Sequence, residues 1–571
     1  MSTALPTDPS RFWLKSYPRD VSPHVEIPAK LLTELVAESA ERWSDRTALV
    51  YYGAKWSYRE FWQESGRFAA ALAREGVKPG DRVALYLPNC PEYPIALFGA
   101  LWLGAIVVQV SPLFLGQDLL RILEDSEPKA LVTLEILYPH VADVAREHSV
   151  PTVFVGRLRD FYPWPSRLFV NTVLRRRKMP TAFPAGPSIR PWRTALRVGP
   201  PPPRFQGDPS TTVAIFQYTG GTTGKPKAAM LTHRNLVANV TQANAWNTTR
   251  VPGEETIVAA IPFFHIYGLT VALLMGLVEG ATIVMQTRPE IRELLKLIDK
   301  YRPTQFPGVP ALYQAFNQQP DIGRYEIRSI KFCLSGSAPL PVPAAKRFEE
   351  LTGASLVEGY GLSETAPATH VNPVHGERRP GSIGLPLPDT EEQVVDLETG
   401  TRILSVGEVG ELAVRGPQVM LGYYRQPEET AAVLRDGWFR TGDIARLDAD
   451  GYAYVVDRKK DMVNVGGMKV YPRQVEDVLF QHPGVADAAA IGVPDAEHGE
   501  VIVAFVVRKP GTSASEEELI RFVRERIAHY KAPRTIEFRE SLPRSGVQKV
   551  LRRVLRDEWA ARHPAAATGP A

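Results

Sequence analysis

The sequence predicts an α/β protein that is too long for a single hydrophobic core. Residues 31–43 and 58–75 repeat apolar side chains at helical spacing, whereas 47–52 and 81–87 have the apolar composition of short strands. Helices and strands that alternate in this way are typical of α/β layers. At 571 residues the chain is expected to form roughly two to four domains.

The composition is that of an ordinary soluble globular protein. Hydrophobic residues make up 44% of the chain and charged residues 23%, and the formal net charge is +4. Two cysteines, Cys90 and Cys333, are too few for a disulfide framework, so we expect a cytoplasmic protein. The N-terminal segment lacks the basic and then apolar pattern of a secretory signal.

Two uncharged segments, 93–117 and 256–278, are long enough to cross a bilayer. Pro94 and Pro112 bracket the first segment, Gly104 splits it into a helix and a strand, and Pro262 interrupts the second. We therefore expect buried helix–strand units, which also look almost continuously apolar when a parallel sheet is covered on both faces.

Glycines, threonines and lysines gather in residues 218–229, which read YTGGTTGKPKAA. Glycines let backbone N–H groups turn toward an anion, threonines add hydroxyl donors, and lysines add positive charge. The flanking segments 212–218 and 227–232 are predicted strands, so the pattern indicates a phosphate-binding hairpin loop. Pro226 follows Lys225, so the loop is not a Walker A motif that runs into a helix. The alternative is a flexible surface turn.

The segment YTGGTTGKPK resembles the phosphate loop of the adenylate-forming, or AMP-binding, enzymes, which include acyl-CoA synthetases, luciferases and peptide-synthetase adenylation domains. The other motifs follow in the order that this family has, and the chain most resembles the bacterial long-chain fatty acid–CoA ligases. The resemblance implies ATP and coenzyme A as co-substrates and Mg²⁺ as cofactor. It also implies ATP contacts from the loop residues Thr219, Gly220, Gly221, Thr222, Thr223, Gly224 and Lys225.

The same resemblance assigns two motifs to the acyl group and the adenine. Residues 261–269 read IPFFHIYGL, and His265 would position and gate the acyl substrate where it meets the adenylate. The attacking carboxylate is already ionised near pH 7, so a base is not needed. Residues 334–341 read LSGSAPLP, whose small side chains would border the adenine at Gly336, Ser337 and Ala338. Taken alone, these motifs would be an ordinary core histidine and a strand-to-turn connection.

Residues 358–365 read EGYGLSET and resemble the family motif for metal and adenine. Tyr360 would lie against the adenine, Ser363 would donate to a phosphate, and Glu364 would hold Mg²⁺. A hard cation that keeps most of its waters needs only one or two carboxylates besides phosphate oxygens. The alternative is the capped start of a helix.

Two charged residues near the C-terminal end are assigned to the ribose of ATP. Residues 438–444 read WFRTGDI, and Asp443 would accept hydrogen bonds from both ribose hydroxyls. Arg458, in the dipeptide DR of the long motif 456–476, would also contact the ribose. The alternatives are a Gly-Asp turn and a charged linker.

The motif over 456–476 also resembles the family's boundary between domains, with Lys460 at the hinge. We expect a large N-terminal AMP-binding region of several subdomains over 1–457, a small mobile α/β domain over 458–557, and a disordered tail over 558–571. The residues expected to lie beside the pantetheine arm of coenzyme A are Gly466 and Gly467.

Residues 542–553 read LPRSGVQKVLRR, and the resemblance makes Lys549 the catalytic lysine of adenylation. Its ammonium group would neutralise charge that develops on the carboxylate and the α-phosphate. The family has a glycine before this lysine, whereas this chain has Gln548, which leaves the loop less free to position Lys549. The alternative is the basic start of a helix.

Residues 157–204 carry eleven basic residues and one acid, Asp160, so the segment has a charge of +10 while the rest of the chain has −6. Within it, 166–178 has the pattern of a short amphipathic basic helix. Docking on an anionic membrane surface is one interpretation. A solvated insertion whose apolar face packs on the domain is the other, and nucleic-acid binding is a third that no other feature supports.

The resemblance implies a long-chain fatty acid–CoA ligase, which forms an acyl-adenylate and then a thioester with coenzyme A. Its partners would be fatty acid, ATP and coenzyme A, without nucleic acid, and with peripheral membrane contact through 157–204. The sequence leaves the oligomeric state open, with a homodimer among the alternatives. Other functions that remain open are a medium-chain or aryl acid–CoA ligase and a non-catalytic, membrane-associated fatty-acid-binding protein.

Overall fold

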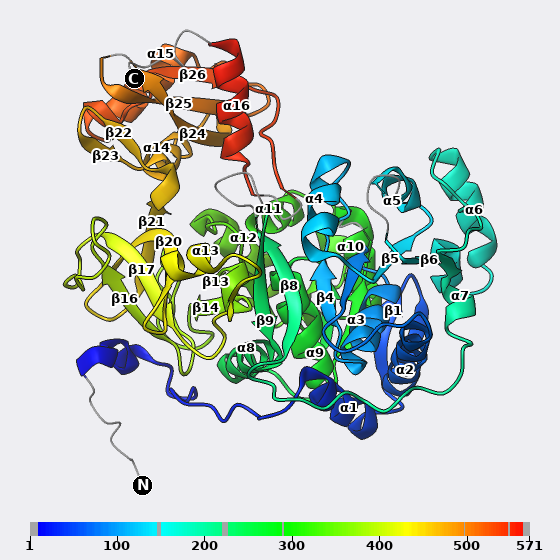
Figure 1. Cartoon of the computed structure of the whole chain (residues 1–571). Helices are drawn as coiled ribbons and strands as arrows, with labels where there is room; N and C mark the ends of the chain where they lie inside the picture. Colours follow the sequence, from blue (N-terminus) through cyan, green and yellow to red (C-terminus); the bar gives the residue numbers. More distant parts are fainter. Residues whose placement is uncertain are drawn as a thin grey trace. The chain divides into compact units, whose positions relative to one another are not determined.

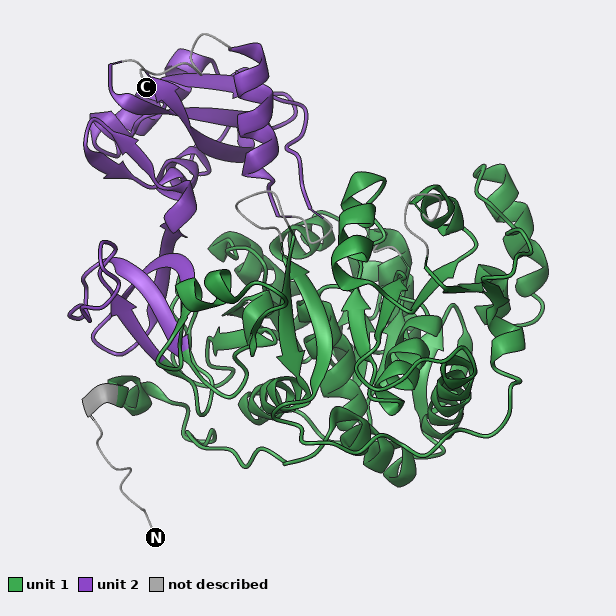
Figure 2. Cartoon of the chain, viewed as in Figure 1, with its two compact units in different colours: residues 1–391, 415–439 green, residues 392–414, 440–571 purple. Residues whose placement is uncertain are grey.

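A computed structural model gives the fold of the chain (Figure 1). It describes residues 9–144, 150–219, 226–287, 290–495, 497–545 and 549–563. The chain forms two compact units: unit 1 contains residues 1–391 and 415–439, and unit 2 contains residues 392–414 and 440–571 (Figure 2). Both units are built of helices packed on sheets, so the predicted α/β architecture is confirmed.

The largest sheet of unit 1 has the strand order β18-β9-β8-β4-β3-β5-β6-β7. Strands β8, β4, β3, β5, β6 and β7 pair in parallel, whereas β9 pairs antiparallel with both β8 and β18. The strands are β3 (Arg82–Tyr86), β4 (Ile106–Gln109), β5 (Ala130–Leu134), β6 (Thr152–Gly156), β7 (Ile189–Pro191), β8 (Val213–Thr219), β9 (Lys227–Thr232) and β18 (Gly422–Tyr423).

Helices bury the apolar side chains of this sheet. Leu119, Leu123 and Val141 of α4 and α5 join Leu131 and Phe216 of the strands in one buried cluster. Burial of this kind contributes roughly 1.5–3 kcal/mol for each large apolar side chain. The helices around the sheet are α2 (Tyr58–Arg74), α3 (Glu92–Trp102), α4 (Gln117–Ser126), α5 (Tyr138–Val144), α6 (Arg167–Arg176), α7 (Trp192–Ala195) and α8 (His233–Trp246).

Helix α3 explains the first uncharged segment, because every residue of this helix is buried. A Cβ atom on Gly99 would lie 2.7 Å from the ring of Phe68, so the missing side chain lets α3 pack closely on α2. The second segment becomes strand β10 (Thr256–Ala259), π-helical turns over Gly268–Leu274 and helix α9 (Met275–Val278). Both segments are therefore interrupted as predicted, and no helix in the described ranges is long and apolar enough to cross a bilayer.

Two smaller sheets complete unit 1, with strand orders β10-β11-β1-β2 and β12-β13-β14-β15. Their strands are β1 (Thr47–Tyr51), β2 (Ala54–Ser57), β11 (Thr282–Met285), β12 (Phe332–Ser335), β13 (Ser355–Gly361), β14 (Ala368–Val371) and β15 (Leu385–Pro386). The remaining helices of this unit are α1 (Leu32–Arg42), α10 (Ile291–Tyr301), α11 (Pro310–Asn317), α12 (Val342–Thr352) and α13 (Pro427–Val433). The helices and the strand predicted over 31–75 are confirmed as α1, β1 and α2.

Unit 2 has a sheet with apolar cores on both faces. Successive residues of β24 point to opposite sides, as in any strand. Ala488 and Ala490 join Leu519 of α15 in one core, while Ile491 joins Leu555 of α16 in the other. The elements are β22 (Val463–Val465), β23 (Met468–Val470), α14 (Pro472–Leu479), β24 (Val485–Asp495), β25 (Gly499–Arg508), α15 (Glu516–Arg524), β26 (Thr535–Phe538) and α16 (Arg552–Arg562).

A further sheet has the strand order β16-β17-β20-β19, and β21 pairs with β20. The strands are β16 (Glu391–Val395), β17 (Gly410–Arg415), β19 (Leu434–Arg435), β20 (Trp438–Leu447) and β21 (Ala453–Arg458). Unit 2 therefore begins upstream of residue 458. The predicted domain boundary at residue 458 marks where the small domain would pivot, and this pivot stays a prediction.

The prediction of a disordered tail over 558–571 is wrong for residues 558–562. Helix α16 continues to Arg562, because Leu555 is fully buried and Trp559 lies edge-on to Phe505 with ring centroids 6.4 Å apart. Arg562 also donates two hydrogen bonds to Glu537, at 2.8 and 2.9 Å. The expectation for 564–571 lies outside the described residues.

A buried carboxyl group lies at the start of α3. Glu92 is 0% exposed, and neither of its carboxyl oxygens has a hydrogen-bond partner among the described residues. Burial, together with the nearby Glu135 carboxylate, holds the pKa of Glu92 well above its usual range. Burial also raises the pKa of Glu135 to about 7, although both its oxygens accept from the Leu158 N–H. We infer that Glu92 carries a proton in the folded protein at neutral pH.

We expect Glu92→Gln to change the pH dependence of stability. The folded state keeps a proton on Glu92 that the unfolded chain releases near pH 4.5, so wild-type stability falls as the pH rises above that value. Glutamine cannot ionise, so the variant should gain about 1.4 kcal/mol over wild type for each pH unit above 4.5, until folded Glu92 ionises. Denaturant unfolding at several pH values measures this gain. Glu124→Gln, on the exposed face of α4, is the control, and parallel profiles for wild type and Glu92→Gln would contradict the assignment.

Candidate active site

Strands β8 and β9 form the predicted hairpin, in which Thr219 pairs with Lys227. Thr219 ends β8, while the loop residues Gly220, Gly221, Thr222, Thr223, Gly224 and Lys225 lie outside the described residues. Lys227 opens β9, forms an ion pair with Glu429, and lies over the ring of Tyr423 at 5.3 Å from its centroid. The hairpin strands are confirmed, and the role of the loop stays a prediction.

Asn89 holds the chain segment that leads to His265. Its side-chain amide donates to the carbonyl oxygens of Ala259 and Ile261, at 3.0 and 2.8 Å, and its Oδ1 accepts from the Phe263 N–H at 2.7 Å. Asn89 is buried, and its three bonds fix the backbone before the histidine. Motif reasoning missed this residue, because it lies far from the motif in sequence.

His265 is half-buried, and its ring has a defined tautomer. Its Nδ1 accepts from the backbone N–H of Tyr267 at 3.2 Å, which places the ring proton of the neutral form on Nε2. The hydroxyl of Tyr267 lies 2.6 Å from the carbonyl oxygen of Leu334 and thus ties this segment to β12. The absence of a side chain at the neighbouring Gly336 leaves room for the Tyr267 ring, because a Cβ atom there would lie 3.2 Å from the ring.

Residues 336–338 follow β12 directly, and β12 pairs in parallel with β13. The carboxyl ends of the two strands therefore meet at one edge of the sheet, which brings Gly336, Ser337 and Ala338 toward the end of β13, where Tyr360 lies. Ser337 has φ of +69°, a conformation that is uncommon outside glycine. The structure thus groups the two segments predicted to border the adenine.

The turn after β13 carries Ser363 and Glu364 in a short 3-10 helix. Gly361 is required at the end of the strand, because a Cβ atom there would lie 1.9 Å from the carbonyl oxygen of Pro367. Tyr360, one residue earlier, lies edge-on to His370 at 6.0 Å. The alternative of a capped helix start is not what forms, because Ser363 and Glu364 lie inside a three-residue 3-10 helix whose N-cap is Leu362. The predicted metal and phosphate roles of this turn stay predictions.

Tyr423 orients Glu364. Its hydroxyl donates to Glu364 Oε1 at 2.8 Å, and the backbone N–H of Met420 donates to the Glu364 carbonyl oxygen at 2.8 Å. Tyr423 belongs to β18, where it pairs with Ala229 of β9. Burial and the adjacent Glu364 raise the pKa of Tyr423, so the phenol keeps its proton as a donor. Strand β18 therefore connects the hairpin to the predicted metal-binding carboxylate, and no recognised motif signalled this tyrosine.

The side chains around Glu364 fit a magnesium ion that binds largely through water and phosphate. No group of three or more histidine, cysteine, aspartate or glutamate side chains that could hold a metal occurs in the described ranges. Glu364 is 9% exposed, and one carboxylate of this kind is a sufficient protein ligand for Mg²⁺ beside phosphate oxygens. The donor set therefore suits a metal that is brought with a nucleotide.

In unit 2, the predicted ribose contacts lie on neighbouring strands. Asp443 of β20 is opposite Arg458 of β21, and Arg458 Nε is 3.3 Å from Asp443 Oδ1. Asp443 is 4% exposed, and its backbone N–H is bound to the Thr441 hydroxyl at 3.1 Å. Pairing of the two strands explains why residues in separate motifs come together.

Lys549 belongs to the same charged cluster of unit 2. Burial, together with the nearby cations Arg458, Lys460 and Arg552, lowers the pKa of Lys549 to about 7, against the opposing effect of Asp443. Burial and Arg458 also lower the pKa of Lys460. The structure thus brings together four predicted residues, which makes unit 2 receptive to an anion at this cluster.

An ion-pair network fixes the chain on both sides of this cluster. Arg552 donates from Nη2 to both carboxylate oxygens of Glu476, at 2.7 Å each, and lies 3.5 Å from Asp461. Arg556 donates to Asp461 at 2.8 Å. These contacts join the start of α16, which comes just after Lys549, to Asp461, which directly follows Lys460. Gln548 lies outside the described residues, so its effect on the loop stays a prediction.

Gly466 and Gly467 form the turn of the β22–β23 hairpin, where Val465 pairs with Met468. Their φ angles are +57° and +85°, and nothing would crowd a Cβ atom at either position. Two-residue turns of this type need positive φ at both positions, which accounts for the two glycines. The predicted contact with coenzyme A stays a prediction.

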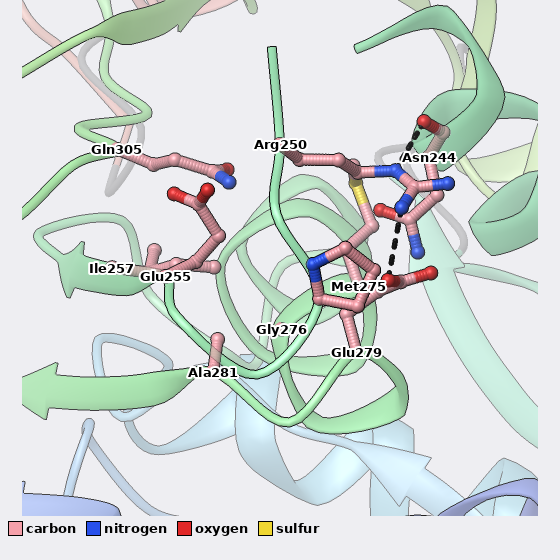
Figure 3. A pocket seen from close by; sticks show the side chains of 10 residues that line it. Asn244, Arg250, Glu255, Ile257, Met275, Gly276, Glu279, Ala281 and Gln305 are labelled. Carbon is pink, nitrogen blue, oxygen red and sulfur yellow. Dashed lines mark hydrogen bonds and ion pairs between the residues drawn. The ribbon is translucent and has the colours of Figure 1, made fainter. Parts of the chain in front are cut away.

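A pocket elsewhere in unit 1 contains none of the predicted site residues (Figure 3). Arg250 crosses it, donating to the carbonyl oxygen of Asn244 and to Glu279 at 2.9 Å. Glu255 accepts from the Val251 N–H at 2.8 Å. Arg250 is thus bound to two other residues that line the pocket, which is consistent with a structural role.

Comparison with known proteins agrees with these features. A family model described as "AMP-binding enzyme" matches residues 36–424, and one described as "AMP-binding enzyme C-terminal domain" matches residues 474–549. A long-chain-fatty-acid–CoA ligase of Bacillus subtilis is 40% identical over 555 residues, which cover 96% of this chain and 98% of that protein. A 4-coumarate–CoA ligase-like protein of Oryza sativa subsp. japonica is 34% identical over 550 residues, or 94% of each chain.

Solved structures of several ligases share the fold. ATP-bound MatB from Rhodopseudomonas palustris has a TM-score of 0.80 at 28% identity and covers 92% of this chain and 99% of its own. The anthranilate CoA ligase AuaEII, in complex with anthranoyl-AMP, has a TM-score of 0.82 at 26% identity and covers 95% and 99%. A benzoate CoA ligase from Burkholderia xenovorans LB400 has a TM-score of 0.79 at 27% identity and covers 92% and 100%. The chain belongs to the AMP-binding enzyme family.

Proposed function

We propose that this adenylate-forming acid–thiol ligase is a long-chain fatty acid–CoA ligase. ATP and coenzyme A are its co-substrates, and Mg²⁺ is the usual metal cofactor of such ligases. The observation that supports long-chain acids is the 40% identity, over nearly the whole length, to bacterial proteins named for that activity. The aryl ligases among the structural relatives support the second candidate, an aryl acid–CoA ligase.

In the first step, a carboxylate oxygen of the acid attacks the α-phosphorus of ATP, and the bond to pyrophosphate breaks. We assign Thr219 and the loop 220–225 to the phosphates, and Glu364 to Mg²⁺, which neutralises phosphate charge when it is bound. Residues 336–338 and Tyr360 border the adenine, Ser363 donates to a phosphate, and His265 positions and gates the acid where it meets the nucleotide. This assignment rests on the edge shared by β12 and β13 and on the hydrogen bond from Tyr423.

We also assign Lys549, Asp443 and Arg458, which all belong to unit 2, to contacts with the nucleotide. Burial and the neighbouring cations lower the pKa of Lys549 to about 7, so a bound anion would favour its protonated form. The ammonium group then stabilises the charge that develops between carboxylate and phosphate.

In the second step, the thiol of coenzyme A attacks the acyl carbon of the adenylate, and AMP leaves. The thiol must lose its proton to attack. We propose that the chain pivots at Lys460, that this withdraws Lys549, and that Gly466 and Gly467 then lie beside the pantetheine arm. One active site would thereby serve two reactions.

The cytoplasm is the proposed location of the enzyme, where it would meet the inner face of the membrane. Both cysteines are free and buried, as suits a reducing compartment. A homodimer is one arrangement that size measurements in solution would test.

Pyrophosphate release with MgATP, coenzyme A and acids from acetate to oleate, with benzoate included, measures the substrate class. We expect a maximum at long chains, because each buried methylene contributes roughly 0.8 kcal/mol. A maximum at benzoate would favour the aryl ligase. Fatty-acid binding without turnover would favour a non-catalytic binding protein and would make Gln548 the first residue to replace by glycine.

We expect Tyr423→Phe to raise the Mg²⁺ concentration at half-maximal adenylation by about tenfold, because Glu364 loses the donor that orients it. A magnesium titration of pyrophosphate release measures this shift. Tyr424→Phe is the matched control, since the ring of Tyr424 packs on Phe216, with centroids 4.5 Å apart. An unchanged magnesium titration in Tyr423→Phe would contradict the role of Glu364.

We expect kcat/KM for adenylation to fall as the pH rises through about 7, because Lys549 of the free enzyme loses its proton there. Lys549→Arg keeps a permanent charge, so this variant should lose the alkaline decline even if its rate is lower. Pyrophosphate release at low ATP gives the profile. Lys459→Arg is the control, because Lys459 is bound to Glu411 at 3.0 Å. The same decline in Lys549→Arg would assign it to another group.

A further inference from the structure

Helix α6 lies at the edge of unit 1 (Figure 1). Much of the apolar surface of this helix and of the residues just before it is exposed. Val170 and Leu174 face the protein and are buried. The large apolar side chains on the other faces of the helix and just before it are exposed by 48% to 75% of their surface: Trp164, Leu168, Phe169 and Val173. The alternative interpretation, in which the apolar face of this helix packs on the domain, therefore holds only for Val170 and Leu174.

The base of this segment is firmly attached to unit 1. Phe161 and Trp192 are buried, and Trp192 packs on Phe68 with ring centroids 4.6 Å apart. Tyr162 stacks on Tyr52 at 5.0 Å. The exposed residues of α6 thus project from an ordered support.

Seven of the eleven basic residues of the segment fall into two groups. Arg159, Arg167 and Arg193 all lie within 4 Å of Asp160, the one acid of the segment, which partly neutralises them. The exposed cations at the end of α6 have no ion-pair partner among the residues that the structure describes: Arg175, Arg176, Arg177 and Lys178. Positive charge available to an outside partner is therefore concentrated beside the exposed apolar side chains.

We propose that the lipid-facing surface, defined as Trp164, Leu168, Phe169 and Val173 with Arg175–Lys178, docks on an anionic lipid bilayer. Apolar and aromatic side chains enter the boundary between headgroups and acyl chains, while adjacent cations attract anionic lipid. A nucleic acid would pair with the cations and give no reason for the exposed aliphatic side chains. The inference rests on the proposed function in one respect: a bilayer is where a long-chain fatty acid dissolves, so the enzyme would meet its substrate there.

Cosedimentation with phosphatidylcholine vesicles, with and without phosphatidylglycerol, tests the docking in the absence of ATP and fatty acid. We expect wild type to bind only the anionic vesicles strongly. Arg175→Gln with Arg176→Gln should weaken this binding about 30-fold, which corresponds to about 1 kcal/mol for each cation near the surface. Arg521→Gln with Arg524→Gln, on exposed positions of α15, removes the same charge and should leave binding unchanged.

The apolar part of the surface is tested by Leu168→Ser with Phe169→Ser. Both side chains are solvent-exposed, so the thermal unfolding midpoint should stay at the wild-type value while vesicle binding weakens at least tenfold. Vesicle binding that survives these changes, or equal binding of all variants to duplex DNA and vesicles, would overturn the proposal in favour of general attraction to polyanions. Pyrophosphate release with a short soluble acid is measured separately, so a failure of the ligase function is distinguishable from a failure of docking.

Discussion

Strand β9 is hydrogen-bonded to β8 on one side and to β18 on the other. This pairing ties three parts of unit 1 together, because β8 enters the predicted phosphate loop, β9 leaves it, and β18 carries Tyr423. The hydrogen bond from Tyr423 then orients Glu364, which lies in the 3-10 helix that follows β13 of a different sheet. The antiparallel pairing therefore gives the predicted phosphate and metal residues a common support.

The sequence predicted the architecture well where the local pattern has one physical solution. The uncharged segments, interrupted at Gly104 and Pro262, became α3, β4 and β10, and the basic amphipathic pattern became α6. The tail prediction failed at 558–562, because the local sequence there does not reveal the tertiary contacts that Leu555 and Trp559 make with the sheet. Such contacts arise only once β25 is in place.

The candidate site was predictable as a set of motifs, though not as a network. Asp443, Arg458, Lys460 and Lys549 were named from three separate segments, and the structure places their charges close enough to act on one another. Asn89, Tyr423 and Arg552 were missed for a common reason: each acts through a residue distant in sequence, to which no local spacing points. The roles predicted for loop 220–225 and for Gly466 and Gly467 remain proposals.

The two cores of the C-terminal sheet have a consequence for how this chain can change over time. Among the described residues, both cores are built from side chains within 463–559. Substitutions confined to unit 1 therefore leave the packing of these two cores intact. The residues proposed to position the acid and the segment that leads to the proposed catalytic Lys549 can thus diverge at different rates, so a change of acid would not require the C-terminal cores to be rebuilt.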